Sequence, residues 1–209
     1  MEWFQLPLGP MQTNAYILYN EHKECLIVDP GEEAHKIKDF IKQKQLKPLA
    51  VLLTHAHFDH IGAVEEVRSK YEIEVHMHIQ EKSWLQTPEK NGSALFQGIK
   101  PIVASPAEQI WEKDKEVNIG TFKFQLYHTP GHSPGSVSFY FREESLLISG
   151  DVLFQGSIGR TDLPGGNMDE LMKSITSKLM TLEDHTYILP GHGPVTTLLE
   201  EKRHNPFLQ

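Results

Sequence analysis

The stretch THAHFDH, residues 54–60, places three imidazoles and one carboxylate within seven positions. Its potential ligands are His55, His57, Asp59 and His60. On a helix, where each residue turns by about 100°, His55 and His57 would point to nearly opposite sides. On a strand, His60 would lie on the face opposite to the other three. We therefore predict that the segment is a loop, because only a loop lets all four side chains meet.

The flanking segments place this loop between a strand and a helix. Residues 49–53, LAVLL, form the short apolar run of a buried strand. The residues that follow carry Ile61, Val64 and Val67 at helical spacing. Loop residues at the carboxyl end of a strand often build binding sites. The cluster is therefore a candidate functional site.

Composition narrows the class of protein and of partner. The chain has 209 residues, 39% of them hydrophobic, with 20 Lys and Arg against 28 Asp and Glu. We predict one globular domain over residues 1–209. The net charge of −8 argues against a nucleic-acid partner. No apolar run approaches the ~18 residues of a membrane span, and MEWFQLPLGP lacks the pattern of a signal peptide, so we expect a cytoplasmic protein without a membrane partner. The sequence does not indicate an oligomeric state.

Local patterns predict strands and helices in two successive halves. The predicted strands are 3–6, 14–19, 24–28, 49–53, 73–77, 121–127, 136–141, 145–149 and 186–189. The predicted helices are 33–44, 61–70, 168–182 and 197–203. This order predicts two sheets sandwiched between helices. Residues 84–107 are the least regular stretch and are either a functional loop or a surface excursion.

Three more ligand-type residues follow predicted strands in the second half. His132 lies in TPGHSPG, Asp151 ends LLISGD, and His192 lies in ILPGHG. Each has glycine beside it, which lets the backbone turn tightly and approach a ligand closely. Together with THAHFDH, these positions predict a metal site. His76 and His78 have no carboxylate motif beside them, and we interpret them as structural.

Asp29 in VDPG, THAHFDH, His132, Asp151 and His192 resemble the five motifs of the metallo-β-lactamase superfamily. The resemblance spans residues 29–192, and its HxHxDH core is highly specific. It implies an α+β fold, a four-layer αββα sandwich with the metal site at one edge between the sheets.

The resemblance also implies how the ligands divide. One metal would be held by His55, His57 and His132, and a second by Asp59, His60 and His192. Asp151 would bridge the two metals. Asp29 is either a support behind the ligands or part of an Asp-Pro-Gly turn with a backbone role alone.

This ligand set predicts a reaction class. Imidazoles and carboxylates without thiolate suit two zinc ions, and also iron or manganese. Paired metals lower the pKa of bound water towards ~7 and so provide a hydroxide nucleophile. We therefore expect metal-assisted hydrolysis, with Asp59 and Asp151 as the catalytic carboxylates.

Within the superfamily, the chain is similar to short bacterial members of the glyoxalase II group, which hydrolyse S-acyl thioesters of glutathione. The stretches GDVLF (150–154) and HNPFL (204–208) carry this similarity. Branches with a cysteine ligand in place of Asp151, or a glutamate in place of His57, do not match. The expected partner is therefore a small-molecule thioester.

The chain differs from full-length glyoxalase II enzymes in two ways that affect which thiol carrier is expected. Full-length glyoxalase II enzymes have a carboxyl-terminal helical domain that this chain is expected to lack. They also have a tyrosine soon after the last histidine, where residues 193–195 here are GPV. Another low-molecular-weight thiol could therefore replace glutathione.

Arg160 matches the place of a lysine that reaches the glutathione portion of the substrate in the glyoxalase II pattern. A guanidinium suits a carboxylate, so Arg160 is a candidate substrate-binding residue. The alternative is a structural salt bridge, for example with Asp162.

Two other functions stay open. A persulfide dioxygenase with one iron shares the HxHxDH motif, and GRTD (159–162) resembles that branch, whereas PGHGP (190–194) does not. A metal-binding protein without catalysis is the other alternative.

Overall fold

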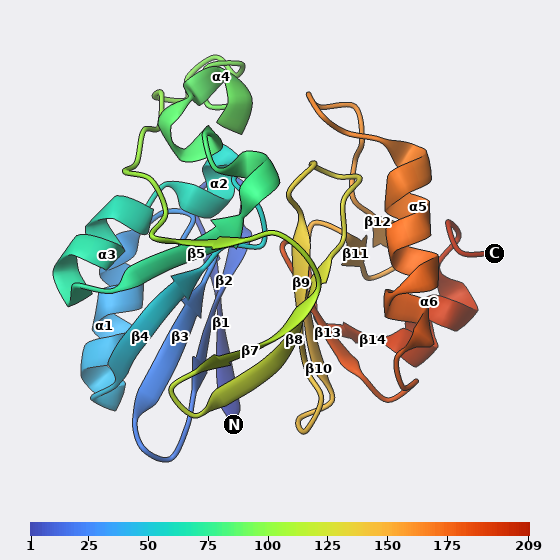
Figure 1. The fold of residues 1–209 in the computed structure, drawn as a ribbon, viewed down its shortest axis with the longest axis horizontal. Coiled ribbons are helices and arrows are strands. Elements are labelled where there is room, and N and C mark those ends of the chain that lie inside the picture. The colour runs from blue at the N-terminus through green and yellow to red at the C-terminus, as the bar shows by residue number, and fades with distance from the viewer. The chain divides into compact units, whose positions relative to one another are not determined.

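Two six-stranded mixed sheets organise the chain (Figure 1). The computed structural model describes all residues from 1 to 209. They divide into two compact units, Met1–Trp111 and Glu112–Gln209, each with one of the sheets and its own helices. The predicted α+β class is thereby confirmed.

The sheet of the first unit has the strand order β1-β2-β3-β4-β5-β6. Its strands are β1 (Glu2–Leu8), β2 (Thr13–Tyr19), β3 (Glu24–Val28), β4 (Lys47–Leu52), β5 (Glu74–His78) and β6 (Gln109–Trp111). Strands β1 to β3 pair antiparallel, and β3 to β6 pair parallel. Parallel pairs need crossover connections. Helices after β3 and β4 provide the first two, and the segment between β5 and β6 provides the third.

Helices α1 (Ala34–Lys44) and α3 (Val64–Tyr71) lie side by side on this sheet (Figure 1). The apolar stripe of α1, with Ile37 and Ile41, packs into the core with Val64 and Val67 of α3. At the carboxyl end of α1, Gln45 has a left-handed backbone (φ 56°), and its N–H caps the last turn of the helix. Burial of the stripe is what holds these short helices in place.

The second unit contains the sheet β14-β13-β10-β9-β8-β7 and a small hairpin. Its strands are β7 (Lys115–Ile119), β8 (Phe122–His128), β9 (Val137–Phe141), β10 (Leu146–Gly150), β11 (Leu153–Phe154), β12 (Ser157–Ile158), β13 (Tyr187–Pro190) and β14 (Thr196–Thr197). Its helices are α5 (Met168–Ser177), the 3-10 turn η3 (Leu179–Thr181) and α6 (Leu198–His204). Leu171 and Ile175 of α5 pack against the buried face of this sheet.

Two predicted helices were too long, and several strands were missed. Instead of one helix over 61–70, the chain forms α2 (Phe58–Ile61) and α3, separated at Gly62 and Ala63. The helix predicted over 168–182 ends at Ser177. Strand β7 (KEVNI) was missed because Val117 is its one buried residue, which leaves almost no apolar periodicity to detect.

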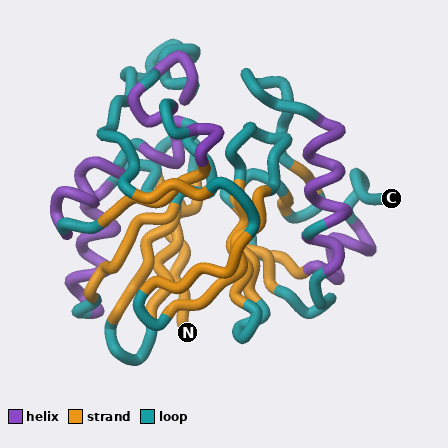
Figure 2. Tube along the Cα trace, viewed as in Figure 1, coloured by secondary structure: helices purple, strands orange, loops and turns teal.

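The irregular segment 84–107 contains the 3-10 turn η2 (Trp84–Gln86) and the short helix α4 (Pro88–Asn91). It follows the 3-10 turn η1 (Ile79–Glu81). Figure 2 shows the segment mostly as loop and short helices. The buried Asn91 ties it together, because its amide donates to the carbonyls of Trp84 and Ile102. The segment is therefore held by specific hydrogen bonds.

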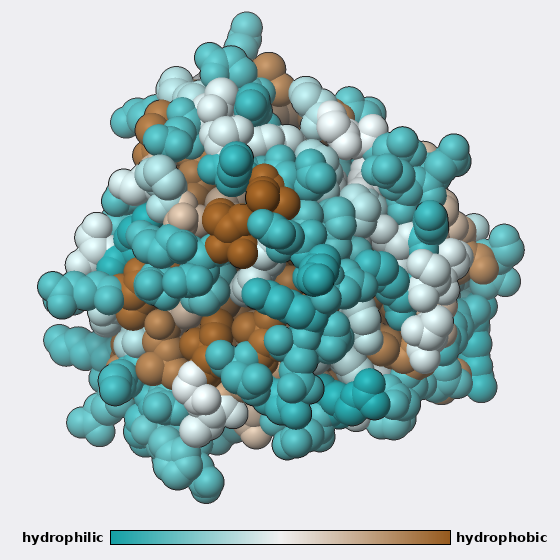
Figure 3. Space-filling model, in the orientation of Figure 1, coloured by the Kyte–Doolittle hydropathy of each residue, from teal (hydrophilic) through white to brown (hydrophobic).

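Hydrophilic residues predominate on the face drawn in Figure 3. None of the helices combines the length and the apolar composition that crossing a membrane requires.

Candidate metal centre

The THAHFDH segment begins where β4 ends. Thr54 to His57 form the predicted loop, with His57 in an extended conformation (φ −68°, ψ 150°). The prediction that the whole segment is a loop is wrong for Asp59 and His60, which lie in α2. The His60 N–H closes this turn by donating to the His57 carbonyl at 3.0 Å. The turn brings Asp59 and His60 back towards the loop.

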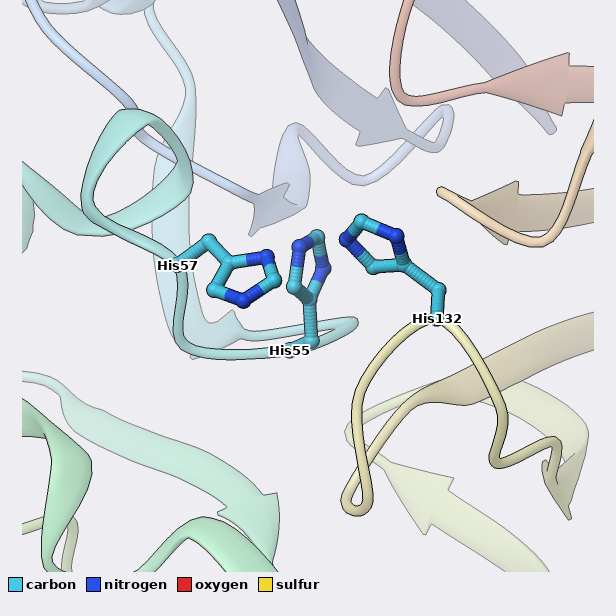
Figure 4. A group of neighbouring side chains, drawn as sticks. All are labelled: His55, His57 and His132. Atoms are coloured by element: carbon cyan, nitrogen blue, oxygen red, sulfur yellow. The ribbon is translucent and has the colours of Figure 1, made fainter. Parts of the chain in front are cut away.

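The four side chains of this segment lie close to one another. The His55 ring lies 4.8 Å from that of His57 and 4.1 Å from that of His60, measured between centroids. The Asp59 Oδ2 atom lies 3.6 Å from His60 Nε2. All three histidines are buried, with exposed fractions of 6% or less. Figure 4 shows His55 and His57 projecting from their shared loop.

Asp29 orients two of these histidines. Its carboxylate accepts from the Thr54 N–H at 2.8 Å and the Thr54 hydroxyl at 2.6 Å, and lies 3.0 Å from His60 Nδ1. His55 Nδ1 lies 3.1 Å from the same hydroxyl. His60 Nδ1 donates to Asp29, because a carboxylate accepts. His55 Nδ1 donates to the Thr54 hydroxyl, because the hydroxyl proton goes to Asp29. Asp29 also has a left-handed backbone (φ 47°), so it serves the turn and the ligands together.

Two supports were missed from the sequence. The Thr13 hydroxyl donates to Asp59 Oδ2 at 2.7 Å, and Thr13 stands 46 residues away with no motif to mark it. A Cβ at Gly31 would lie 1.9 Å from the Asp59 carbonyl oxygen. The Asp-Pro-Gly turn therefore needs glycine because α2 packs directly on it.

In the second unit, sheet topology gathers the other three residues. His132 follows β8, Asp151 directly follows β10, and His192 follows β13. Strands β10 and β13 are parallel, and β8 runs the same way because β9 is antiparallel to both β8 and β10. Their carboxyl ends thus meet at one edge. Asp151 Oδ2 lies 3.6 Å from His132 Nε2 and 3.5 Å from His192 Nε2.

Backbone atoms position this second group. His132 Nδ1 donates to the Arg160 carbonyl at 2.8 Å, and Figure 4 shows the His132 ring at the tip of its loop. A Cβ at Gly159 would lie 1.9 Å from the Asp151 carbonyl oxygen, so this glycine permits a close approach. The Arg160 main chain therefore supports the site.

The Arg160 side chain forms the salt bridge of the alternative interpretation. Its Nε and Nη2 atoms donate to the two oxygens of Asp162, each at 2.7 Å. This hydrogen bonding lowers the pKa of Asp162 to about 2 and raises that of Arg160. Binding of a substrate tail by Arg160 stays a prediction.

The donor chemistry of each unit fits a divalent cation. The nitrogen–oxygen separations of 3.5 to 3.6 Å are too long for hydrogen bonds. Two ligands bound tetrahedrally to one metal at 2.0–2.2 Å would be roughly 3.3–3.6 Å apart. Where Nδ1 donates, the neutral ring carries its lone pair on Nε2, the tautomer found in known metal sites. No thiolate takes part, because Cys25 is buried in β3, where burial raises its pKa to about 12.

Comparison with known proteins connects this geometry to a family. Residues 8–192 match the model of the metallo-beta-lactamase superfamily. A probable metallo-hydrolase of Bacillus subtilis is 56% identical over 208 residues, covering 100% of this chain and 98% of that protein. A hydroxyacylglutathione hydrolase of Haemophilus influenzae is 35% identical over 204 residues, covering 97% and 96%.

Solved structures agree with this family. The B3 metallo-beta-lactamase BLEG-1 has a TM-score of 0.97 at 53% identity, covering 99% of both chains. TTHA1623 in a di-iron-bound form has a TM-score of 0.85 at 38% identity, covering 98% of this chain and 100% of that one. ETHE1 from Myxococcus xanthus has a TM-score of 0.81 at 30% identity, covering 99% and 84%.

Proposed function

Because the chain belongs to the metallo-β-lactamase superfamily, we propose that it is a two-metal hydrolase for S-acyl thioesters of glutathione or a similar small thiol. The observation that carries the two-metal proposal is the position of Asp151. Its Oδ2 atom lies at metal-sharing distance from both His132 and His192. A carboxylate oxygen so placed suits a bridge between two cations.

The ligand division follows the family motif. His55, His57 and His132 would hold one metal, and Asp59, His60 and His192 the other. The imidazole and carboxylate donors favour zinc, with iron or manganese as alternatives. The di-iron-bound form of TTHA1623 supports iron as an alternative.

Bound divalent cations would make water acidic enough to attack at neutral pH and would polarise the substrate carbonyl. The contribution of the protein residues is to orient the ligands and the attacking water. The Thr13 hydroxyl fixes Asp59, whose carboxylate can then accept a hydrogen bond from the attacking water. His132 is held by the Arg160 carbonyl, and Asp151 would be a metal ligand beside His132 and His192. No serine or cysteine nucleophile is needed.

The thioester part of the proposal rests on sequence similarity. The hydroxyacylglutathione hydrolase of Haemophilus influenzae is similar along almost the whole of both chains. Two other similarities support competing activities. ETHE1 supports the persulfide dioxygenase alternative, and BLEG-1 supports hydrolysis of a β-lactam amide.

One experiment separates these functions. Metal content is measured by mass spectrometry, and the same preparation is tested with S-lactoylglutathione, a small uncharged thioester, a chromogenic cephalosporin, and glutathione persulfide with oxygen uptake. We expect two metals per chain and the fastest turnover on a thioester. One iron with sulfite production would establish the dioxygenase, and faster cephalosporin cleavage would establish a lactamase. Bound metal without turnover on any substrate would favour a non-catalytic protein.

A further inference from the structure

A second buried carboxylate contacts the ligand loop. Glu81 is the last residue of η1 and has an exposed fraction of 1%. Its Oε2 atom accepts a hydrogen bond from the Ala56 N–H at 2.6 Å. Ala56 stands between His55 and His57, so this bond fixes the backbone between two adjacent ligands. We propose that Glu81 is a positioning residue that fixes this loop for metal binding and strengthens metal binding through its charge.

The local geometry explains why the loop needs such a contact. Residues 54–57 belong to neither a strand nor a helix, so their N–H groups require partners from elsewhere. Asp29 accepts from the Thr54 N–H, and Glu81 accepts from the Ala56 N–H. The two carboxylates therefore hold the backbone on both sides of His55. The aim of His55 and His57 depends on these contacts.

Charge gives Glu81 a second effect. Removing a carboxylate from water is unfavourable unless nearby positive charge and hydrogen bonds offset the lost hydration. A cation held by His55 and His57 would supply positive charge near Glu81. Glu81 should therefore favour the metal-loaded protein over the metal-free protein, in addition to any effect on folding. This inference rests on the proposed metal site.

The test compares Glu81→Gln, which keeps the size and an acceptor oxygen, with Glu81→Ala, which removes both the acceptor and the charge. Glu201→Gln is the matched control. Glu201 is also buried, at 2% exposed, and accepts from a backbone N–H, that of Gly156, at 2.8 Å. For each protein, the zinc Kd is measured by competition with a chelator. The Tm is measured with and without zinc.

We expect Glu81→Ala to weaken zinc binding by about 10- to 100-fold, the range for groups that support metal ligands. Glu81→Gln should give a smaller loss because it keeps the hydrogen bond. The rise in Tm on adding zinc should shrink in both variants. Glu201→Gln should lower the Tm with and without zinc equally and leave the zinc Kd unchanged.

An unchanged zinc Kd in Glu81→Gln and Glu81→Ala, with equal Tm losses in both metal states, would reduce Glu81 to a folding residue. If Glu81→Ala does not fold, Glu81→Gln decides: an unchanged zinc Kd there overturns the charge effect. Metal binding and thioester cleavage by the unsubstituted protein distinguish failure of the Glu81 proposal from failure of the proposed function. A parent that binds no metal overturns both proposals, whereas a parent that binds zinc without cleaving thioesters overturns the substrate proposal alone.

Discussion

The two sets of proposed ligands are built by different means. In the first unit, His55, His57, Asp59 and His60 come from one stretch of seven residues. In the second, three ligands come from three strand ends, spread over residues 132–192. The sheet positions these three ligands, because the ends of strands that run in the same direction lie at one edge of the sheet. A contiguous loop has no such register, so buried side chains must hold it.

Burial and anchoring follow this division. The histidines of the first set are almost fully buried. Two of them are held by Asp29: His60 directly, and His55 through the Thr54 hydroxyl. In the second set, His132 rests on a backbone carbonyl, and the His192 side chain is 30% exposed. Substitutions behind the first set should therefore act through lost side-chain contacts. In the second set, substitution of the ligands themselves should have the largest effect on metal binding.

The largest effect is expected for Asp151→Ala, because Asp151 is the one residue proposed to serve both metals. Its loss leaves two adjacent cations with less negative charge between them. We expect metal content to fall at both positions and turnover to fall on the order of 1000-fold or more. Mass spectrometry and thioester assays measure both. Two retained metals with normal turnover would remove Asp151 from the bridge.

The next largest effect is expected for His60→Ala, which tests how the ligands divide between the two metals. His60→Ala should remove the second metal preferentially, leave close to one metal per chain, and lower turnover roughly 100-fold. His22→Ala is the control, because His22 has a side chain that is 65% exposed, and it should keep both metals. If His60→Ala binds two metals as tightly as the parent, the proposed ligand division is wrong.

Much of the first set was predictable from the sequence because its ligands are adjacent in it. The strand ends that carry His132, Asp151 and His192 were also predicted within a residue or two. Such buried strands have clear apolar runs, and glycine marks the turns after them.

The supporting contacts could not be predicted in this way. Thr13 contacts Asp59 and Glu81 contacts Ala56 across 46 and 25 residues. Neither residue belongs to a motif, and their types are common on protein surfaces. The helical turn of α2 was missed because four residues are too few for a helical period to be visible.

Asp29→Asn separates the two roles of Asp29. Asparagine tolerates the left-handed backbone and keeps the turn. Its amide nitrogen cannot accept. In place of Oδ1 it loses the Thr54 N–H contact, and in place of Oδ2 it loses the contacts with the Thr54 hydroxyl and His60. We expect metal affinity to fall about 10- to 100-fold, measured by chelator competition. Unchanged affinity would assign Asp29 to the turn alone.

The smallest effect is expected at Arg160, whose main chain and side chain can be tested separately. The Arg160 carbonyl accepts from His132 Nδ1, and substitution of the side chain retains that carbonyl. The guanidinium pairs with Asp162 at the surface, and such exposed pairs hold weakly. If the proposed thiol carrier has a carboxylate, the guanidinium would be able to exchange Asp162 for it.

Because that exchange gives up one ion pair to form another, the gain for the substrate should be small. Arg160→Ala should lower kcat/KM for a thioester with a charged carrier by about tenfold, the low end for charge-assisted hydrogen bonds. Asp162→Asn should raise it slightly, since the guanidinium is then released. Metal content and turnover of a small uncharged thioester should stay unchanged in both variants. Equal losses on both thioesters in Arg160→Ala would show that the side chain supports the His132 loop and does not bind the carrier.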